Sequence, residues 1–186
     1  MDDLSELKAS WNRRPSIIAI GLGDFIFRDE GVGIHAVRRF QQLKPRPCLA
    51  VEVGTSILDT VQMIESADRI LAFDTIEAGG LPGTVYALHV KDIMRKDKYN
   101  MLRDMRLIQI LQTIVHPPSE IVIVGAEPRN TEWGTELSPA LDYAATVMVS
   151  TAQKVISKWR NWTSGCEQVD LRSIIRDSRY EIRQVQ

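Results

Sequence analysis

Three acidic segments of the chain contain the side chains whose types and spacing are best suited to chemistry. Their sequences are GLGDFIFRDEG at 21–31, DTIEAGGLPGT at 74–84 and GAEPRNTEWGTELSP at 125–139. Glu30 and Asp74 stand out, because each closely follows an apolar run that is typical of a buried strand. Two carboxylates brought to one place form a hard, anionic site that suits a divalent cation.

A structural alternative is that these acidic residues only stabilise their own segments. In that interpretation Asp29 or Glu30 favours the positive end of the helix that follows, and Asp74 caps a loop. The two interpretations differ in what the fold must do. If the strands that end near positions 20 and 73 are neighbours, their carboxyl ends meet at one edge of the sheet and favour a site.

A dinucleotide site is the first competing chemistry, because Gly21 and Gly23 open a Gly-x-Gly turn after a strand. Ile26 stands where the third glycine would be, and the following helix begins only near Gly31. The turn is therefore too long to place a pyrophosphate on the helix. The sequence also has no Gly-x-Ser-x-Gly elbow, no His-Glu-x-x-His pair and no lysine-bearing phosphate loop.

The elements that must position these residues follow from apolar periodicity and from glycine and proline. The pattern predicts strands over 16–20, 48–53, 69–73, 84–90 and 120–124, and helices over 32–43, 56–66, 101–115 and 138–159. Such alternation is typical of a mostly parallel sheet with helices on both faces. Residues 75–83 leave no space for a crossover helix, so we expect strand 84–90 to return antiparallel to its predecessor.

The predicted fold is therefore α/β: a three-layer sandwich with a twisted, mixed five-stranded sheet that contains one antiparallel strand. A length of 186 residues fits one such domain, which we place at 1–160. Residues 161–186 have few apolar positions, and we expect a tail that is either mobile or docked as a helix.

Composition excludes several classes of protein and partner. With 44% hydrophobic and 25% charged residues, the chain is neither disordered nor fibrous, and its net charge of −1 provides no field that would attract nucleic acid or an anionic membrane. No apolar run approaches the length of a membrane span, and no signal-peptide core is evident. Cys48 and Cys166 lack Cys-x-x-Cys spacing, so we expect a reduced, cytoplasmic protein. The absence of heptads favours a monomer.

The three acidic segments together resemble the hydrogenase maturation endopeptidases, which remove a C-terminal peptide from the large subunit of nickel–iron hydrogenase after nickel insertion. The first segment is similar to the family's Gly-x-Gly-Asn followed by Asp-Glu-Gly-x-Gly. The second is similar to Asp followed by Gly-Gly-x-Pro-Gly-Thr, and the third to Gly-x-Glu-Pro followed by Trp-Gly and Leu-Ser-Pro. The resemblance covers roughly 17–155.

The resemblance implies three metal-binding residues: a glutamate, an aspartate and a histidine before the third helix. Glu30 and Asp74 match the first two. Aligned without gaps, the histidine position falls on Asn100, with His89 as the alternative. We favour Asn100, because an antiparallel strand that begins near position 84 would carry residue 89 about 15 to 20 Å toward the opposite edge. An amide oxygen is a poorer nickel ligand than an imidazole nitrogen.

The resemblance further implies an endopeptidase that acts on the precursor of the hydrogenase large subunit. Glu30 and Asp74 would bind the nickel of the substrate, and no cofactor would be bound permanently, with zinc or cadmium as surrogates for nickel. Asp24, where the family has asparagine, would assist as a base. Three glycines would let the second segment approach the substrate tail closely: Gly79, Gly80 and Gly83.

Two other functions stay open at this level. Loss of the histidine at position 100 is consistent with a non-catalytic maturation factor of the same fold, which would bind the precursor without cleaving it. A nucleotide-dependent enzyme is the third candidate, and it would have to bind a nicotinamide cofactor.

Overall fold

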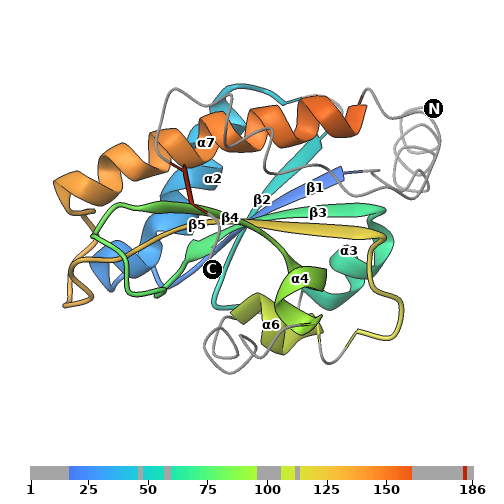
Figure 1. The fold of residues 1–186 in the computed structure, drawn as a ribbon, viewed down its shortest axis with the longest axis horizontal. Helices are drawn as coiled ribbons and strands as arrows, with labels where there is room; N and C mark the ends of the chain where they lie inside the picture. Colours follow the sequence, from blue (N-terminus) through green and yellow to red (C-terminus); the bar gives the residue numbers. More distant parts are fainter. Residues whose placement is uncertain are drawn as a thin grey trace, which may run out of the picture.

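A computed structural model describes residues 17–45, 48–56, 60–95, 106–111, 114–160 and 182–183 of the chain. A mixed sheet in the order β2-β1-β3-β5-β4-β6 forms its centre (Figure 1). The strands are β1 (Ile17–Leu22), β2 (Cys48–Gly54), β3 (Arg69–Thr75), β4 (Val85–His89), β5 (Glu120–Ala126) and β6 (Ile182–Arg183). Strands β2, β1, β3 and β5 are parallel, and β4 is antiparallel to β5.

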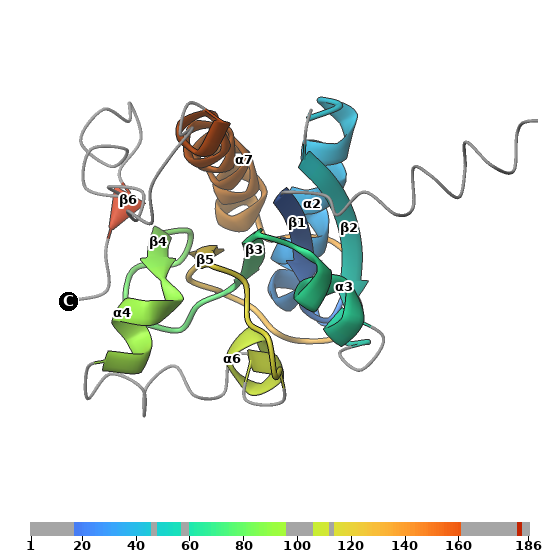
Figure 2. The ribbon, with the colours of Figure 1, turned by 90° about the vertical axis from the view of Figure 1, so that its right-hand side faces the viewer.

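Helices cover both faces of this sheet, which confirms the three-layer arrangement. The described helices are η1 (Arg28–Gly31), α2 (Val32–Gln42), α3 (Val61–Ser66), α4 (Val90–Arg95), α6 (Arg106–Leu111) and α7 (Pro139–Arg160). Helices α2 and α7 lie on one face, and α3, α4 and α6 lie on the other (Figure 2).

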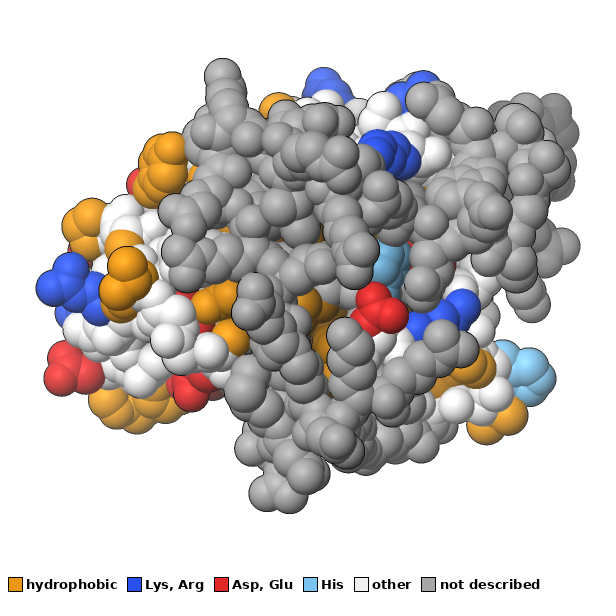
Figure 3. Space-filling model, viewed as in Figure 1, with side chains coloured by type: hydrophobic (Ala, Val, Ile, Leu, Met, Phe, Trp, Pro, Cys, Tyr) orange, Lys and Arg blue, Asp and Glu red, His pale blue; other side chains and the backbone are white. Residues whose placement is uncertain are grey.

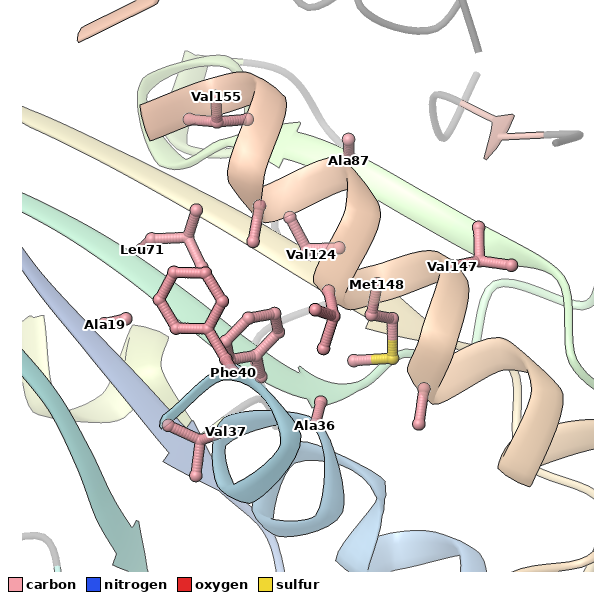
Figure 4. Close-up of a cluster of buried hydrophobic side chains, with 14 of the residues drawn as sticks. Ala19, Ala36, Val37, Phe40, Leu71, Ala87, Val124, Val147, Met148 and Val155 are labelled. Carbon is pink, nitrogen blue, oxygen red and sulfur yellow. The ribbon is translucent and has the colours of Figure 1, made fainter. Parts of the chain in front are cut away.

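Two hydrophobic clusters hold the layers together, because successive side chains of a strand point to opposite faces. In β1, Ile17 faces α2 and α7, whereas Ile18 faces the other helices. Figure 4 shows Phe40 of α2 and Met148 of α7 between these helices and the strands. The Phe40 ring meets the ring of Phe73 edge to face, with the ring centres 5.8 Å apart.

The position of β4 corrects one prediction from the sequence. As predicted, β4 runs antiparallel to β3, because β3 and β5 are parallel and β4 is antiparallel to β5. The two strands do not pair directly, however, since β5 lies between them and β4 pairs with β5. Every residue of β5 is buried, so an interior place with a partner on each side satisfies its backbone. Residues 76–84 can reach past β5, since an extended chain of that length spans about 30 Å, against about 10 Å for two strand spacings.

Helix boundaries also differ from the prediction. Residue 90 begins helix α4 rather than ending a strand. The described part of α6 is Arg106–Leu111, and residues 114 and 115 are not helical, so the predicted end at Val115 is too late; the predicted start at Met101 lies outside the described residues. In contrast, α7 begins at Pro139, as predicted, and ends at Arg160.

The expected C-terminal tail, 161–186, falls almost entirely outside the described residues. Only Ile182–Arg183 is described, and these residues form β6, a sixth strand that pairs in parallel with Val85 and Tyr86 of β4. None of the described helices combines the length and the apolar character that crossing a bilayer requires.

Gly33 in the first turn of α2 generates a prediction about the fold. A Cβ atom at this position would overlap with the backbone carbonyl oxygens of Leu22 and Phe73. Gly33→Ala should therefore lower the free energy of unfolding by about 3 kcal/mol, measured by urea denaturation. Gly79→Ala is the control, because no atom lies within 4 Å of its Cβ position and only its φ of +77° opposes alanine. That control should cost about 1 kcal/mol, and an equal loss in both variants would contradict the packing argument.

Candidate functional site

Glu30 and Asp74 lie at the same edge of the sheet. Strands β1 and β3 are parallel neighbours, so their carboxyl ends meet there. Glu30 belongs to η1, which follows β1, and the Thr75 hydroxyl at the end of β3 donates a hydrogen bond to the Glu30 carbonyl oxygen over 3.3 Å. Asp74 is buried, and its Oδ1 accepts the amide of Thr75 at 2.8 Å. The structure thus brings together the two segments that carry these carboxylates.

Glu30 is positioned by close contact between the two ends of the first loop, where the backbone of Gly23 meets that of Glu30. Gly23 has a φ of +117°, and a Cβ atom on it would overlap with the Glu30 carbonyl oxygen. A side chain at position 23 would push η1 away from the end of β1. The Gly-x-Gly turn that resembled a dinucleotide motif therefore serves this close backbone approach.

Asp29 fastens the first loop to the third. Its side chain is fully buried (0% exposed) and accepts the backbone amides of Arg129 and Asn130, both at 2.9 Å. It also accepts the amide of Ser138 at 2.7 Å and the hydroxyl of Ser138 at 2.9 Å. Four hydrogen bonds from a segment about a hundred residues away make Asp29 a structural residue.

Glu127 fastens the third loop to the second in the same manner. Its buried carboxylate accepts the backbone amides of Ala78 at 2.9 Å and Gly79 at 3.2 Å, and the hydroxyl of Tyr86 at 2.9 Å. Its backbone also accepts the amide of Gly83 at 2.8 Å. The Gly-rich second loop is thus held by a residue of a different loop.

The sequence pattern does not indicate that Asp29 and Glu127 fasten one loop to another. Both occur in the acidic motifs, in DEG and GAEP, but a sequence pattern does not show whether an acidic side chain is buried or which backbone it meets. The sequence offers one indication of their importance: Asp29 stands next to the candidate ligand Glu30, and Glu127 stands next to a proline within its motif. That signal marks the residues as important without separating binding from clamping.

The other predicted site residues have mixed surroundings. Oδ1 of Asp24 accepts the amide of Ile26 at 3.2 Å, which closes a local turn in the first loop. The space around Gly79 is open, as close approach of a substrate backbone would need. Gly80 and Gly83 instead serve internal packing, since a Cβ atom would overlap with the Tyr86 hydroxyl in the first case and lie 3.0 Å from the Ala140 carbonyl oxygen in the second.

His89 lies away from the edge that holds Glu30 and Asp74. It pairs with Val122, three residues before the partner of Asp74 on β5, a shift of about 10 Å along the strands. Its Nδ1 lies 3.6 Å from Oε1 of Glu120, the first residue of β5. The register therefore does not bring His89 to the two carboxylates. Asn100 lies outside the described residues.

Two further residues of reactive type, Cys48 and His35, have shifted pKa values. Burial raises the pKa of the Cys48 thiol to about 12, so it is protonated at neutral pH. Burial also lowers the pKa of His35, which the hydrogen bond to the Thr135 carbonyl partly offsets. Within the described part of the chain, no three His, Cys, Asp or Glu side chains are grouped as metal ligands.

Comparison with known proteins adds independent information to this geometry. A model of the hydrogenase maturation protease family matches residues 34–155. The chain belongs to the hydrogenase maturation protease family. This membership confirms the resemblance to the family, which is a family of peptidases. The matched residues include the second and third acidic segments, whereas the first, at 21–31, precedes them.

Relatives in other organisms agree with this assignment. HupD of Bradyrhizobium diazoefficiens, a hydrogenase expression/formation protein, is 26% identical over 151 residues, or 77% of this chain and 79% of the relative. HoxM of Cupriavidus necator is 25% identical over 152 residues, 77% of this chain and 75% of the relative.

The fold is shared with solved maturation proteases. The hydrogenase maturating endopeptidase HybD from E. coli has a TM-score of 0.65 at 19% identity, covering 76% of this chain and 92% of that chain. The NiFe hydrogenase maturation protease HybD from Thermococcus kodakarensis has a TM-score of 0.58 at 22% identity, covering 75% and 97%. At these identities the likeness shows the fold.

The Asp29 clamp yields a prediction about stability. Asp29→Asn should lower the free energy of unfolding by about 2 to 3 kcal/mol, because an NH₂ group would face backbone amides that need an acceptor. Urea denaturation measures the loss, and hydrogen exchange at the amides of Arg129 and Asn130 should accelerate. Asp24→Asn is the matched control, since the Asp24 side chain accepts a single amide at the surface and should cost less than about 1 kcal/mol. Equal losses would contradict the clamp.

Proposed function

We propose that this protein removes the C-terminal peptide from the large-subunit precursor of a nickel–iron hydrogenase after nickel has been inserted. The observation that carries the proposal is the placement of Glu30 and Asp74 at one edge of the sheet, tied through Thr75. Membership of the protease family supplies the reaction class. The reaction would take place in the cytoplasm, in keeping with the cysteine usage.

In the proposed reaction the two carboxylates bind the nickel of the substrate, because oxygen donors at a partly enclosed edge suit a divalent cation. The metal belongs to the substrate, where it would polarise the scissile carbonyl or lower the pKa of a water molecule. Asp24 is the proposed base that accepts the proton of the attacking water. Hydrolysis adds this water to the peptide carbon, breaks the carbon–nitrogen bond and returns a proton to the leaving amine.

The proposal assigns further roles to Asn100 and Gly79. Asn100 is the proposed third donor to the metal, through its side-chain oxygen. Gly79 is the proposed point where the substrate tail comes close to the second loop, because the space above it is open and its own amide is held by Glu127. In this proposal Glu127 binds one side of the second loop, and the substrate tail binds the opposite side.

Substitution of the two carboxylates tests the proposal. Glu30→Gln and Asp74→Asn should each abolish removal of the tail, because a neutral amide binds a divalent cation far more weakly than a carboxylate does. Incubation with nickel-loaded precursor, read by the mass of the large subunit, measures the loss. Glu136→Gln, an exposed acidic residue of the third loop, should cleave like the wild type. Full activity in both site variants would remove these residues from the mechanism.

The same incubation decides between cleavage and simple binding. A non-catalytic maturation factor would form a stable complex with the precursor and leave its mass unchanged. Shortening of the precursor by the wild type, and an unchanged mass with Asp74→Asn, is the result expected from a peptidase.

The third metal ligand can be tested without the precursor. Asn100→His should tighten the binding of cadmium by about 10 to 100-fold, because it restores a nitrogen donor. His89→Ala should leave the affinity unchanged, since His89 lies toward the opposite edge beside Glu120. Calorimetric titration of the wild type and both variants measures the three affinities. An affinity that falls in His89→Ala and does not move in Asn100→His would reverse the assignment.

A further inference from the structure

Two loops place large apolar side chains in solvent beside the candidate site. Trp133 of the third loop is 73% exposed, and Ile26 of the first loop is 43% exposed. Phe27 lies under Trp133, with ring centres 4.9 Å apart. We call Trp133 and Phe27, together with their apolar neighbour Ile26, the aromatic tip. In Figure 3, hydrophobic side chains reach the surface at the left end of the molecule, where Figure 1 places the loops that precede α2 and α7.

Backbone hydrogen bonds hold the aromatic tip in place. The amide of Arg28 donates to the carbonyl of Gly134 at 2.8 Å, and the amide of Gly134 donates to the carbonyl of Ile26 at 2.9 Å. These bonds form an isolated parallel bridge between Phe27 and Gly134. The two loops therefore carry Trp133 on a small, paired unit of backbone rather than on an unsupported turn.

Two residues that take part in these hydrogen bonds, Arg28 and Gly134, have positive φ angles, and only Arg28 carries a side chain that opposes this conformation. Arg28 has a φ of +46°, which is disfavoured for any residue with a side chain. Gly134 has a φ of +149°, and a Cβ atom there would lie 2.9 Å from Nε of Arg28. That Nε donates to the carbonyl of Trp133 at 3.3 Å. Strain of this kind persists where surrounding contacts enforce it, and it concentrates at functional sites.

We infer that the aromatic tip is the docking contact for the protein substrate, which would present an apolar pocket to Trp133 near its cleavable tail. The inference rests on the proposed function. Arg28 and Glu30 belong to the same turn of η1, and the amide of Ile26 is bound by Asp24. The amide of Glu30 donates to the carbonyl of Phe27 at 3.0 Å, so Glu30 and Phe27 lie in one turn. A folded protein that delivers its tail to Glu30 therefore comes close to the tip. A rigid tryptophan is a common anchor of such contacts.

The size of the aromatic tip favours this occupant over a second copy of the chain. An aromatic side chain buries about 150 to 250 Å². Three side chains of that size supply at most about 750 Å², and the tip supplies less, because Ile26 is smaller and only 43% exposed. A stable dimer needs roughly 800 Å² from each partner. A substrate does not depend on the tip alone, because it is also held at the two carboxylates. The tip is large enough to add affinity to that contact.

Val115 serves as the control residue, because it is also an exposed apolar residue but lies far from the candidate site. It is 77% exposed, close to the value for Trp133, but it precedes β5 and so lies at the edge of the sheet opposite to Glu30. Trp133→Ala and Val115→Ala each remove an exposed apolar side chain, so neither should disturb the core. Trp133→Phe keeps an aromatic anchor at the same position.

The experiment measures KM and kcat for removal of the tail from the nickel-loaded precursor, and in parallel the Kd of the precursor complex by calorimetry. Trp133→Ala should raise both KM and Kd by about 10 to 100-fold, with kcat within about twofold of the wild type, since the residue binds without touching the reacting atoms. Trp133→Phe should recover most of the affinity. Val115→Ala should match the wild type.

The outcomes separate this inference from the proposed function. A wild-type protein that binds the precursor without shortening it overturns the peptidase proposal, and the Kd values then still decide on the tip. Unchanged KM and Kd in Trp133→Ala overturn the docking contact while leaving the peptidase proposal standing. A wild-type dimer in sedimentation that Trp133→Ala converts to monomer would assign the tip to a second copy and also overturn the inference.

Discussion

The Asp29 carboxylate is fully buried, and burying such a group is costly unless hydrogen bonds compensate it. Compensation comes from three backbone amides and one hydroxyl of the third loop. The first loop cannot move away from the third without exposing those donors or leaving the carboxylate unpaired. The geometry of Glu30, the next residue, is therefore tied to a segment about a hundred residues further along the chain.

Glu127 extends the same constraint to the second loop. It accepts two of that loop's amides and the Tyr86 hydroxyl, so three loops from three parallel strands form one connected unit. Loops at the carboxyl ends of parallel strands are the usual place for binding sites. Here buried carboxylates give these loops rigidity, and Glu30 and Asp74, the proposed ligands of the metal, belong to this connected unit.

This rigidity also accounts for the exposed tryptophan. Trp133 follows the segment that Asp29 binds, and the Gly134 pairing fixes its backbone against the first loop. Without those bonds, an exposed aromatic side chain on a long loop would fold onto the protein's own surface, and less of its apolar area would stay exposed to a partner. The exposed position of Trp133 and the position of Glu30 therefore both depend on the hydrogen bonds between the first and third loops.

By itself the sequence determined the alternation of strands and helices, the three-layer fold, the family and the two carboxylates that follow β1 and β3. These features depend on local periodicity and on motifs whose spacing is written in the chain. The place of β4 beyond β5 was decided by β5, the fully buried strand that needs a hydrogen-bonding partner on each edge. Local sequence patterns do not show which of two strands will take the interior place in a sheet. Likewise, Asp29 and Glu30 are adjacent acidic residues in the sequence, and only tertiary structure separated the buried clamp from the candidate ligand. The distinction comes from desolvation and from the direction of each side chain, which are set by contacts between distant segments.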